Sequence, residues 1–283
     1  MRKKILVTGA TGNVGFEVLK LLKAQNIPLS AAILDTEYNL QKVGVDTPKV
    51  ILDFYDPTTY QPALENIEKI FLMRPPQIAE VKKYINPFID QAIKEGIKHI
   101  AFLSLMGGNP FVPHYKIERH IKKRKIPYTF LRASFFMQNM NTTHQPQIKD
   151  TNEIFIPAGK GKISFIDVRD IAAVAVKALL EPNHTNKTYN LTGGEALDFY
   201  QVSNILSTIL ERKINYTNPH PREFQARMIK EGYNEELVDV MNKLYFIVKM
   251  GKAGKITPDT KELLGREPIK FEQYAKDYAH YWQ

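Results

Sequence analysis

The sequence contains no cysteine, and this absence excludes several kinds of chemistry. Without thiols the chain has no disulfides, no thiolate nucleophile and no cysteine-ligated zinc. We therefore expect a reducing compartment, the cytoplasm. The chain also lacks any apolar run near the roughly 20 residues that span a bilayer, so no membrane segment is expected. The apolar stretch behind Arg2, Lys3 and Lys4 is too short for a signal peptide.

Two catalytic patterns are missing as well. No His, Asp and Glu residues recur with metal-ligand spacing, and no Gly-x-Ser-x-Gly elbow is present. We therefore expect no metal site and no acyl-transfer chemistry.

The formal net charge of +9 raises the question of nucleic acid. Part of it lies in Lys122-Lys123-Arg124-Lys125, at the predicted C-terminus of a helix, where cations favour the helix dipole. Without a nucleic-acid module, we interpret these residues as a solvated helix end, and nucleic acid is not an expected partner. A basic surface also attracts an anionic cofactor or substrate.

The first two-thirds of the chain alternates short β-branched runs with amphipathic segments, which is typical of parallel βαβ units. The predicted strands are Lys4–Thr8, Leu29–Leu34, Lys49–Leu52, Lys69–Leu72, His99–Leu103, Tyr128–Leu131 and Thr188–Leu191. The predicted helices between them are Val14–Gln25, Pro57–Glu65, Ile78–Glu95, Pro113–Lys125 and Val168–Leu180. We predict an α/β fold, a doubly wound Rossmann parallel sheet with its ligand at the carboxyl ends of the strands.

Beyond about residue 190 helices dominate. They are predicted at Asp198–Glu211, Arg222–Glu231, Asn234–Met250 and Phe271–Trp282, with one strand at Ile214–Thr217. We predict a dinucleotide-binding core over 1–191, which crosses into a second lobe at 135–165. Residues 192–283 then form a smaller, mostly helical lobe that binds substrate.

Residues 4–15 carry the most specific signal. The strand-forming run Ile5 to Thr8 leads directly into Gly9-Ala-Thr-Gly-Asn-Val-Gly15, and an apolar-periodic helix follows. Glycine-turn amides and a helix N-terminus attract a pyrophosphate, and the missing Cβ atoms let it approach. The cofactor-binding residues expected in this stretch are Gly9, Thr11, Gly12, Asn13, Val14 and Gly15.

Other cofactor contacts are expected where later strands end. Asp35 lies 20 residues after Gly15, and a carboxylate there accepts bonds from the ribose hydroxyls and repels a 2′-phosphate. Lys42 could instead neutralise that phosphate, so the choice is NAD or NADP, and Asp35 favours NAD. Asp53 and Phe54 are expected to border the adenine. Met73, Arg74 and Pro75 are expected to line the pyrophosphate and ribose, with a surface cation as the alternative for Arg74.

Several stretches resemble a known family. Residues 8–15 are similar to the glycine motif of atypical short-chain dehydrogenases. Residues 127–139, 165–175 (Phe-Ile-Asp-Val-Arg-Asp-Ile-Ala-Ala-Val-Ala) and 257–268 resemble three motifs of NmrA-like proteins. The resemblance covers most of the chain and points to the NAD(P)H:quinone oxidoreductase branch. The family also contains regulators that bind the dinucleotide without turning it over.

Short-chain dehydrogenases usually carry Tyr-x-x-x-Lys on the helix after the fifth strand. Here that spacing occurs only at Tyr38…Lys42 and Tyr245…Lys249, both outside that helix. Counting back from the sixth strand puts His114 at the lysine position and Pro110 at the tyrosine position. We expect His114 to bind the ribose or the acceptor oxygen, or to supply a proton near neutral pH. Its alternative is an exposed polar residue.

Ser104, after the fifth strand, is the second catalytic candidate and also a cofactor contact. The alternative for Ser104 is that it caps the turn after that strand. An apolar pocket for the acceptor is expected from residues after the fifth and sixth strands, with ordinary core as the alternative. Its candidate residues are Met106, Phe111, Phe135, Phe136 and Met137, with Gln138 and Asn139 as amide contacts.

The residues and the resemblance together predict an NAD(P)-dependent oxidoreductase. We expect hydride transfer from NAD(P)H to a small molecule, a quinone or a similar conjugated acceptor, by a monomer or homodimer. The missing Tyr-x-x-x-Lys leaves an alternative, a catalytically inactive redox sensor that binds the dinucleotide and a protein partner.

Overall fold

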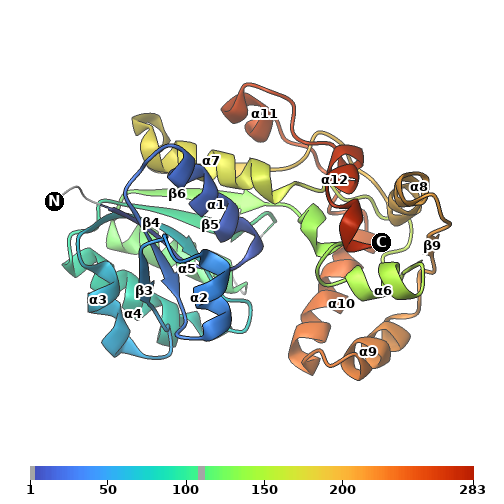
Figure 1. Ribbon diagram of the computed structural model, residues 1–283, viewed down its shortest axis with the longest axis horizontal. Coiled ribbons are helices and arrows are strands. Elements are labelled where there is room, and N and C mark those ends of the chain that lie inside the picture. The colour runs from blue at the N-terminus through green and yellow to red at the C-terminus, as the bar shows by residue number, and fades with distance from the viewer. Residues whose placement is uncertain (1–3, 108–111) are drawn as a thin grey trace. The chain divides into compact units, whose positions relative to one another are not determined.

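The computed structural model describes residues 4–107 and 112–283, which fall into two compact units (Figure 1). The first unit comprises residues 1–133 and 168–191, and the second comprises 134–167 and 192–283. The chain thus leaves the first unit once, returns for one helix and one strand, and leaves it again.

A seven-stranded sheet in the order β3-β2-β1-β4-β5-β6-β8 forms the centre of the first unit. All of its pairs are parallel. The strands are β1 (Lys4–Val7), β2 (Leu29–Ile33), β3 (Lys49–Ile51), β4 (Ile67–Met73), β5 (His99–Leu105), β6 (Tyr128–Ala133) and β8 (Lys187–Leu191). The order reverses between β1 and β4, which makes their carboxyl ends the switch point where such sheets bind ligands. The predicted doubly wound Rossmann sheet is confirmed.

Helices cover both faces of this sheet. They are α1 (Asn13–Ala24), α2 (Glu37–Val43), α3 (Tyr60–Leu64), α4 (Val81–Lys94), α5 (Pro113–Arg124) and α7 (Val168–Leu180). Helix α1 packs against α7 on one face, and α4 contacts both α3 and α5 on the other (Figure 1). The spacing of Val14, Val18 and Leu22 explains this placement of α1, because these three side chains are buried on one stripe.

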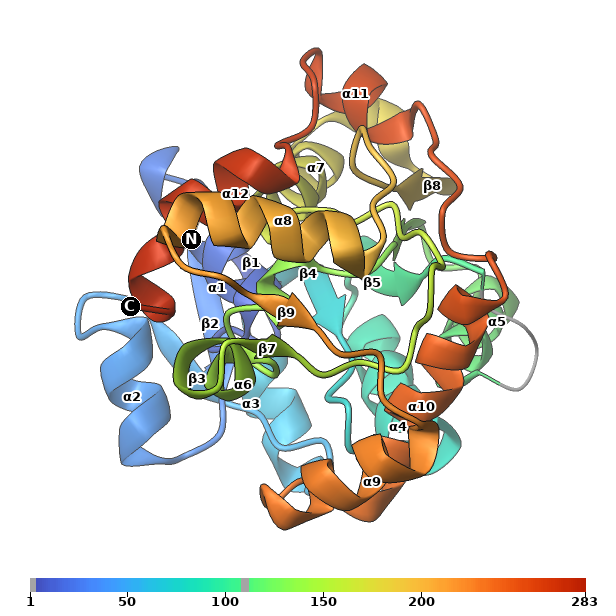
Figure 2. The same cartoon turned by 90° about the vertical axis from the view of Figure 1, so that its right-hand side faces the viewer.

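The second unit is mostly helical. Its helices are α6 (Gln145–Asp150), α8 (Phe199–Leu210), α9 (Pro221–Lys230), α10 (Glu235–Lys249), α11 (Asp259–Leu264) and α12 (Phe271–Asp277). Two short parallel strands, β7 (Glu153–Ile154) and β9 (Asn215–Tyr216), lie side by side (Figure 2). The predicted strand over 214–217 is present as β9. Neither β7 nor α6 was predicted, because elements of two and six residues show no periodicity.

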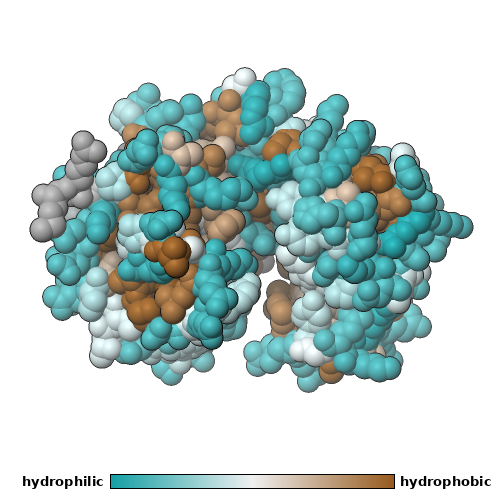
Figure 3. Space-filling view, in the orientation of Figure 1, coloured by the Kyte–Doolittle hydropathy of each residue, from teal (hydrophilic) through white to brown (hydrophobic). Residues whose placement is uncertain are grey.

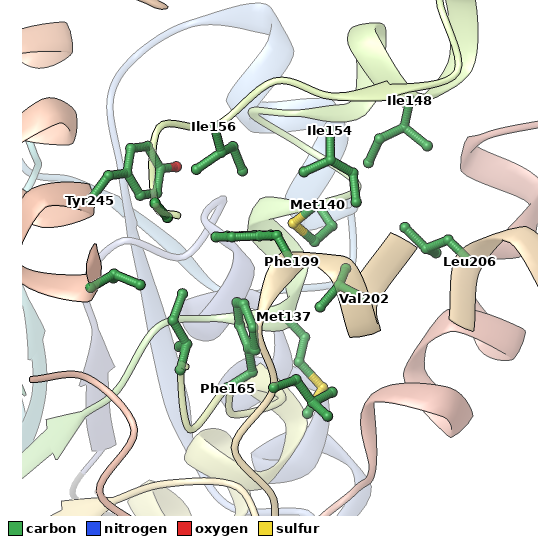
Figure 4. Close-up of a cluster of buried hydrophobic side chains, with 14 of the residues drawn as sticks. Met137, Met140, Ile148, Ile154, Ile156, Phe165, Phe199, Val202, Leu206 and Tyr245 are labelled. Carbon is green, nitrogen blue, oxygen red and sulfur yellow. The ribbon is translucent and has the colours of Figure 1, made fainter. Parts of the chain in front are cut away.

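Aromatic and aliphatic side chains fill the core of the second unit. Met137, Met140, Phe165 and Phe199 point into one cluster (Figure 4). The indole of Trp282, the single tryptophan, is fully buried and donates to the Met140 carbonyl at 3.0 Å. This bond ties the end of the chain to the segment that follows β6.

A buried histidine–tyrosine pair also holds this core together. The His144 imidazole Nε2 lies 2.6 Å from the Tyr245 hydroxyl of α10. Burial lowers the pKa of His144 to about 4 and raises that of Tyr245, since desolvation disfavours the charged form of each. The pair is therefore neutral at neutral pH.

Hydrophilic residues cover most of the face shown in Figure 3. Hydrophobic residues gather near the β2–α2–β3 edge of the first unit, where Leu34, Leu40, Val45 and Ile51 are exposed (Figure 3). Among the described residues, no helix combines the length and the apolar character that crossing a membrane requires.

We predict that the second unit loses stability in mild acid because of His144. The unfolded chain takes up the proton near the ordinary pKa of about 6.5, and the folded chain does so only near about 4. The contribution is complete above the higher value and is lost as the pH falls toward the lower one. The expected loss is about 2 kcal/mol between about pH 7 and about pH 5, measured by denaturant unfolding followed through Trp282 fluorescence.

In His144→Asn this loss of about 2 kcal/mol should disappear, and the pH dependence that remains comes from other buried histidines such as His99, whose pKa burial also lowers. His280→Asn, which alters an exposed histidine, serves as the matched control and should keep the wild-type slope. Equal slopes in all three proteins would refute the assignment to His144.

Candidate functional site

The turn between β1 and α1 is shaped by close backbone contacts. Gly9 has a φ of +62°, and its carbonyl accepts the Gly12 N–H at 2.9 Å. A Cβ on Gly15 would lie 2.1 Å from the Gly9 oxygen, so only glycine lets α1 start this close to the turn. Helix α1 begins at Asn13 with Gly12 as its N-cap, and no side chain caps it. The first amides of the helix therefore remain available to an anion.

The remaining residues of this motif differ in exposure. Asn13 is exposed, Thr11 is half-buried, and Val14 is buried in the core. Thr11 and Asn13 therefore keep side chains that a ligand can reach, whereas Val14 can offer only its backbone.

Met73, at the end of β4, packs directly against the glycine turn. Its Cε would clash with a Cβ on Gly9 at 2.1 Å and would lie 3.0 Å from one on Gly12. The Thr8 hydroxyl accepts the Met73 N–H at 2.8 Å and joins the ends of β1 and β4. The structure thus brings Met73 and the glycine motif together, as the sequence predicts for neighbours in a pyrophosphate site.

Arg74 lacks an acidic partner among the described residues. Its Nη1 donates to the carbonyl oxygens of Pro75, Pro76 and Ile78 at 2.8–2.9 Å. Its Nε is buried without any hydrogen-bond partner in the described part of the chain. Burial lowers the pKa of Arg74 to about 10, which still leaves the guanidinium charged at neutral pH.

His114, in the first turn of α5, is affected by the charge of Arg74. Burial and, to a smaller extent, this charge lower the pKa of His114 to about 3. Its Nδ1 is buried, with no hydrogen-bond partner among the described residues. The imidazole is therefore neutral near pH 7. It can donate or accept a hydrogen bond, but the imidazolium expected to supply a proton near neutral pH is not populated.

Ser104 belongs to a buried network that the sequence analysis missed. Its hydroxyl donates to Glu118 of α5 at 2.6 Å, and the Arg132 guanidinium of β6 binds the same carboxylate through two nitrogens at 2.9 and 2.6 Å. Ser104 and Glu118 are both buried. The Ser104 proton is thus directed toward Glu118, and its hydroxyl oxygen can still accept a bond.

Asp35 and Lys42 lie beyond the end of β2, and both are exposed. Thr36 caps α2 by accepting the Asn39 N–H at 3.3 Å, which places Asp35 immediately before the helix. The Lys42 amine lies 3.0 Å from the Tyr38 hydroxyl one turn earlier. Lys42 therefore lies along α2 with Tyr38 and does not pair with Asp35.

Asp53 and Phe54 both follow β3, but their side chains lie in different environments. The Asp53 carboxylate is half-buried and accepts the Tyr55 N–H at 2.8 Å. Phe54 is buried in the core, with its ring 5.2 Å from that of Phe88 in an edge-to-face contact. Phe54 thus packs on α4. Bordering an adenine would require its ring to lie at the surface, and it does not.

The residues predicted to bind the acceptor differ in burial. Met106 is half-buried after β5, and Phe111, like Pro110, lies outside the described residues. Met137 is fully buried in the second unit's core, and the Gln138 amide donates to Asp167 at 3.0 Å within that unit. Both are held by internal contacts, which matches the core alternative. Phe135, Phe136 and Asn139 are only half-buried.

These observations fit a dinucleotide cofactor. At the turn from Gly9 to Gly15, which we call the glycine cradle, no described side chain caps the first amides of α1. Two buried nitrogens, Arg74 Nε and His114 Nδ1, also lack partners among the described residues. Amides and a guanidinium suit phosphate groups, and an imidazole suits a ribose hydroxyl. Among the described residues, no three His, Cys, Asp or Glu side chains cluster as a metal site requires.

A sequence model of the NmrA-like family matches residues 1–275. The chain belongs to this family. Among its relatives is an NAD(P)H azoreductase from Xenophilus azovorans, 31% identical over 97% of this chain and 98% of the relative. The resemblance seen in the four sequence motifs is thereby confirmed.

Solved structures share the fold of this NmrA-like chain. A triphenylmethane reductase from Citrobacter sp. superposes with a TM-score of 0.85 at 23% identity, covering 98% of this chain and 99% of the other. An NADPH-dependent quinone oxidoreductase from Escherichia coli, complexed with NADPH, gives 0.84 at 23% identity, covering 99% and 100%. The predicted preference for NAD is not supported by these proteins, whose names give NAD(P)H or NADPH.

We predict that Gly15→Ala weakens dinucleotide binding about tenfold or more. The new Cβ must push α1 away from the Gly9 carbonyl, which displaces the amides that face the phosphates. Titration of NADPH, followed by calorimetry, measures the effect. Gly194→Ala is the matched control, because its Cβ would meet nothing nearer than Pro268 Cδ at 3.7 Å. Equal affinities for NADPH in Gly15→Ala and wild type would contradict the role of the cradle.

Proposed function

We propose that this NmrA-like protein is an NAD(P)H-dependent oxidoreductase that reduces small conjugated acceptors, namely quinones and azo dyes. The proposal rests on one observation, the glycine cradle, where Gly9, Gly12 and Gly15 allow α1 to begin close to the end of β1. The azoreductase relative, matched over nearly the full length of both chains, supports the same chemistry.

The residues around the cradle hold the two halves of the dinucleotide. The amides at the start of α1 bind the pyrophosphate, with Arg74 as its charged partner. The Nδ1 of His114, which has no partner among the described residues, receives or donates a bond at the nicotinamide ribose or at the acceptor oxygen. The Ser104 hydroxyl oxygen, held by Glu118, accepts a further hydrogen bond near the end of β5.

The cofactor supplies a hydride from its nicotinamide ring, and the acceptor takes up that hydride and one proton. A quinone becomes a hydroquinone in this way, and its oxygen needs little help from a strong acid. The absence of Tyr-x-x-x-Lys from α5 therefore suits a quinone better than a simple ketone. His114 donates a hydrogen bond from its neutral ring, and solvent supplies the proton.

We assign acceptor recognition to the second unit. Phe135, Phe136 and Asn139 follow β6 directly and are half-buried, so each retains surface for a ligand. Phenylalanine rings suit a flat conjugated molecule, and an amide suits its oxygen.

A dinucleotide sensor without turnover is the second candidate. The observation that favours it is the position of the two Tyr-x-x-x-Lys matches, on α2 and on α10 rather than on α5. Tyr245 is buried against His144, and burial raises its pKa, so it serves the core and not proton transfer.

We predict acceptor-dependent oxidation of NADPH by the purified protein. A small para-quinone, an azo dye and a triphenylmethane dye are supplied in turn, and the loss of reduced-nicotinamide absorbance is followed. His114→Ala should lower quinone turnover at least about threefold, the loss expected for one neutral hydrogen bond. His280→Ala, an exposed histidine, is the matched control. Because burial lowers the pKa of His114 to about 3, turnover should show no histidine titration between about pH 5 and about pH 8.

The sensor would bind NADPH without oxidising it in the presence of any acceptor, and that outcome contradicts the proposed enzyme. Unchanged turnover in His114→Ala would remove His114 from the site while leaving the reductase intact.

We also predict that Asp35 and Lys42 shift coenzyme preference in opposite directions. Asp35→Ala removes a carboxylate that repels a 2′-phosphate, so the NADPH-to-NADH affinity ratio should rise about tenfold. Lys42→Ala removes the nearby cation and should lower that ratio. Calorimetric titration with both coenzymes measures it, with Lys49→Ala as a lysine control. An unchanged ratio in Asp35→Ala would show that this carboxylate does not face the ribose.

A further inference from the structure

A basic hollow lies between α4 and α5 of the first unit. Its volume is about 370 Å³. Seven side chains line it: Lys82, Asn86, Tyr115, Lys116, Arg119, His120 and Lys123. None of the seven is acidic, and none belongs to the glycine motif or to the residues assigned to the cofactor.

Helical spacing builds this hollow. Lys82 and Asn86 stand one turn apart on α4, and Tyr115, Arg119 and Lys123 follow the same spacing along α5. Residues three and four apart share one helix face, so each helix presents one polar stripe to the other. The hollow is therefore a product of two helices that contact each other, not a chance cluster on a loop.

Other basic residues of α5 are already engaged elsewhere. Lys122 lies over the rings of Tyr128 and Phe130, with its amine 5.5–5.7 Å from their centroids. Arg124 pairs with Asp90 at 2.6 Å. Lys122 and Arg124 thus contact other side chains, so only part of the basic run at the end of this helix is the solvated helix end that the sequence suggests.

Apart from His120, the basic residues of the hollow lack an acidic counterion among the described residues. His120 lies 2.7 Å from Asp90, whose other oxygen binds Arg124. Four cations make no ion pair with a carboxylate of the residues that the structure describes: Lys82, Lys116, Arg119 and Lys123. Like charges gathered in one recess repel each other, and a bound anion relieves that repulsion.

Asn86 provides an independent sign of a ligand. Asn86 lines the hollow, and its Oδ1 is buried, with no hydrogen-bond partner within the described residues. A buried polar atom without a partner is costly, so a ligand that supplies one is favoured. A hydroxyl satisfies the oxygen, and a phosphate satisfies the amide if its nitrogen and oxygen exchange places.

We propose that the hollow between α4 and α5 is a second ligand site, which binds a small molecule carrying several phosphate charges. Lysine and arginine side chains supply the charge, and Asn86 and Tyr115 supply neutral hydrogen bonds. The volume matches that of small-molecule sites, which favours a compact ligand over a long polymer. The site is separate from the proposed reductase activity and does not depend on it.

Binding of inorganic tripolyphosphate to the NADPH-saturated protein tests the proposal. Excess NADPH occupies the dinucleotide cradle, so calorimetry at low salt reports any additional site. We expect saturable binding of one tripolyphosphate per chain. The double change Arg119→Gln/Lys123→Gln should weaken it about tenfold or more, because two charge-assisted bonds are lost. Lys187→Gln/Lys213→Gln alters net charge equally at exposed sites and should leave the affinity unchanged.

A second variant tests the site through a different residue. Asn86→Asp places a carboxylate among the cations, and it should weaken tripolyphosphate binding without lowering the unfolding temperature. Absence of saturable binding, or equal weakening in the Lys187 and Lys213 control, would overturn the site. Tighter binding of single-stranded oligonucleotides that grows with their length would replace it with a nucleic-acid track.

Discussion

The close approach of helix α1 to the turn after β1 is the constraint on which the rest of the first unit depends. The Gly9 carbonyl occupies the space where a side chain at residue 15 would begin. This contact fixes the direction of α1, which in turn packs on α7 and covers one face of the sheet. It also fixes the first amides of α1 beside the ends of β1 and β4, where the strand order reverses. One steric condition thus serves both the fold and the anion site.

Around that turn, neighbouring strands deliver chemically distinct groups. Met73 fills the space beside the glycines, Arg74 adds a charge, and Ser104, the penultimate residue of β5, directs its hydroxyl at Glu118. Because parallel strands end at one edge, residues some 30 positions apart in the chain become neighbours without any local signal between them. Placement at this edge follows from topology, whereas the orientation of each side chain follows from its partners.

The sequence predicted what local pattern determines. The buried strands and most helices of the first unit carry clear periodicity, but the seven-residue helix α2 was not predicted. The glycine spacing reflects the need for close backbone contact. Glu118 lies 14 positions after Ser104 and 14 positions before Arg132, so no local pattern connects the three residues. A charged residue in a basic helix is also expected to lie at the surface. One signal was available, because Glu118 shares the buried face of α5 with Ile117 and Ile121. The low pKa of His114 and the core position of Met137 depend on burial, which no local pattern encodes.

The polar atoms left without partners argue for function more strongly than the motifs do. A buried donor without an acceptor costs roughly 1–3 kcal/mol, and a ligand that supplies the acceptor offsets this cost. Arg74 carries its charge against three carbonyl oxygens, with no carboxylate beside it in the described residues, and its Nε donates to nothing there. An anionic ligand supplies the missing acceptor and the missing charge together. If Arg74 binds a phosphate as we propose, ligand binding and the folding stability of the first unit are linked through this guanidinium.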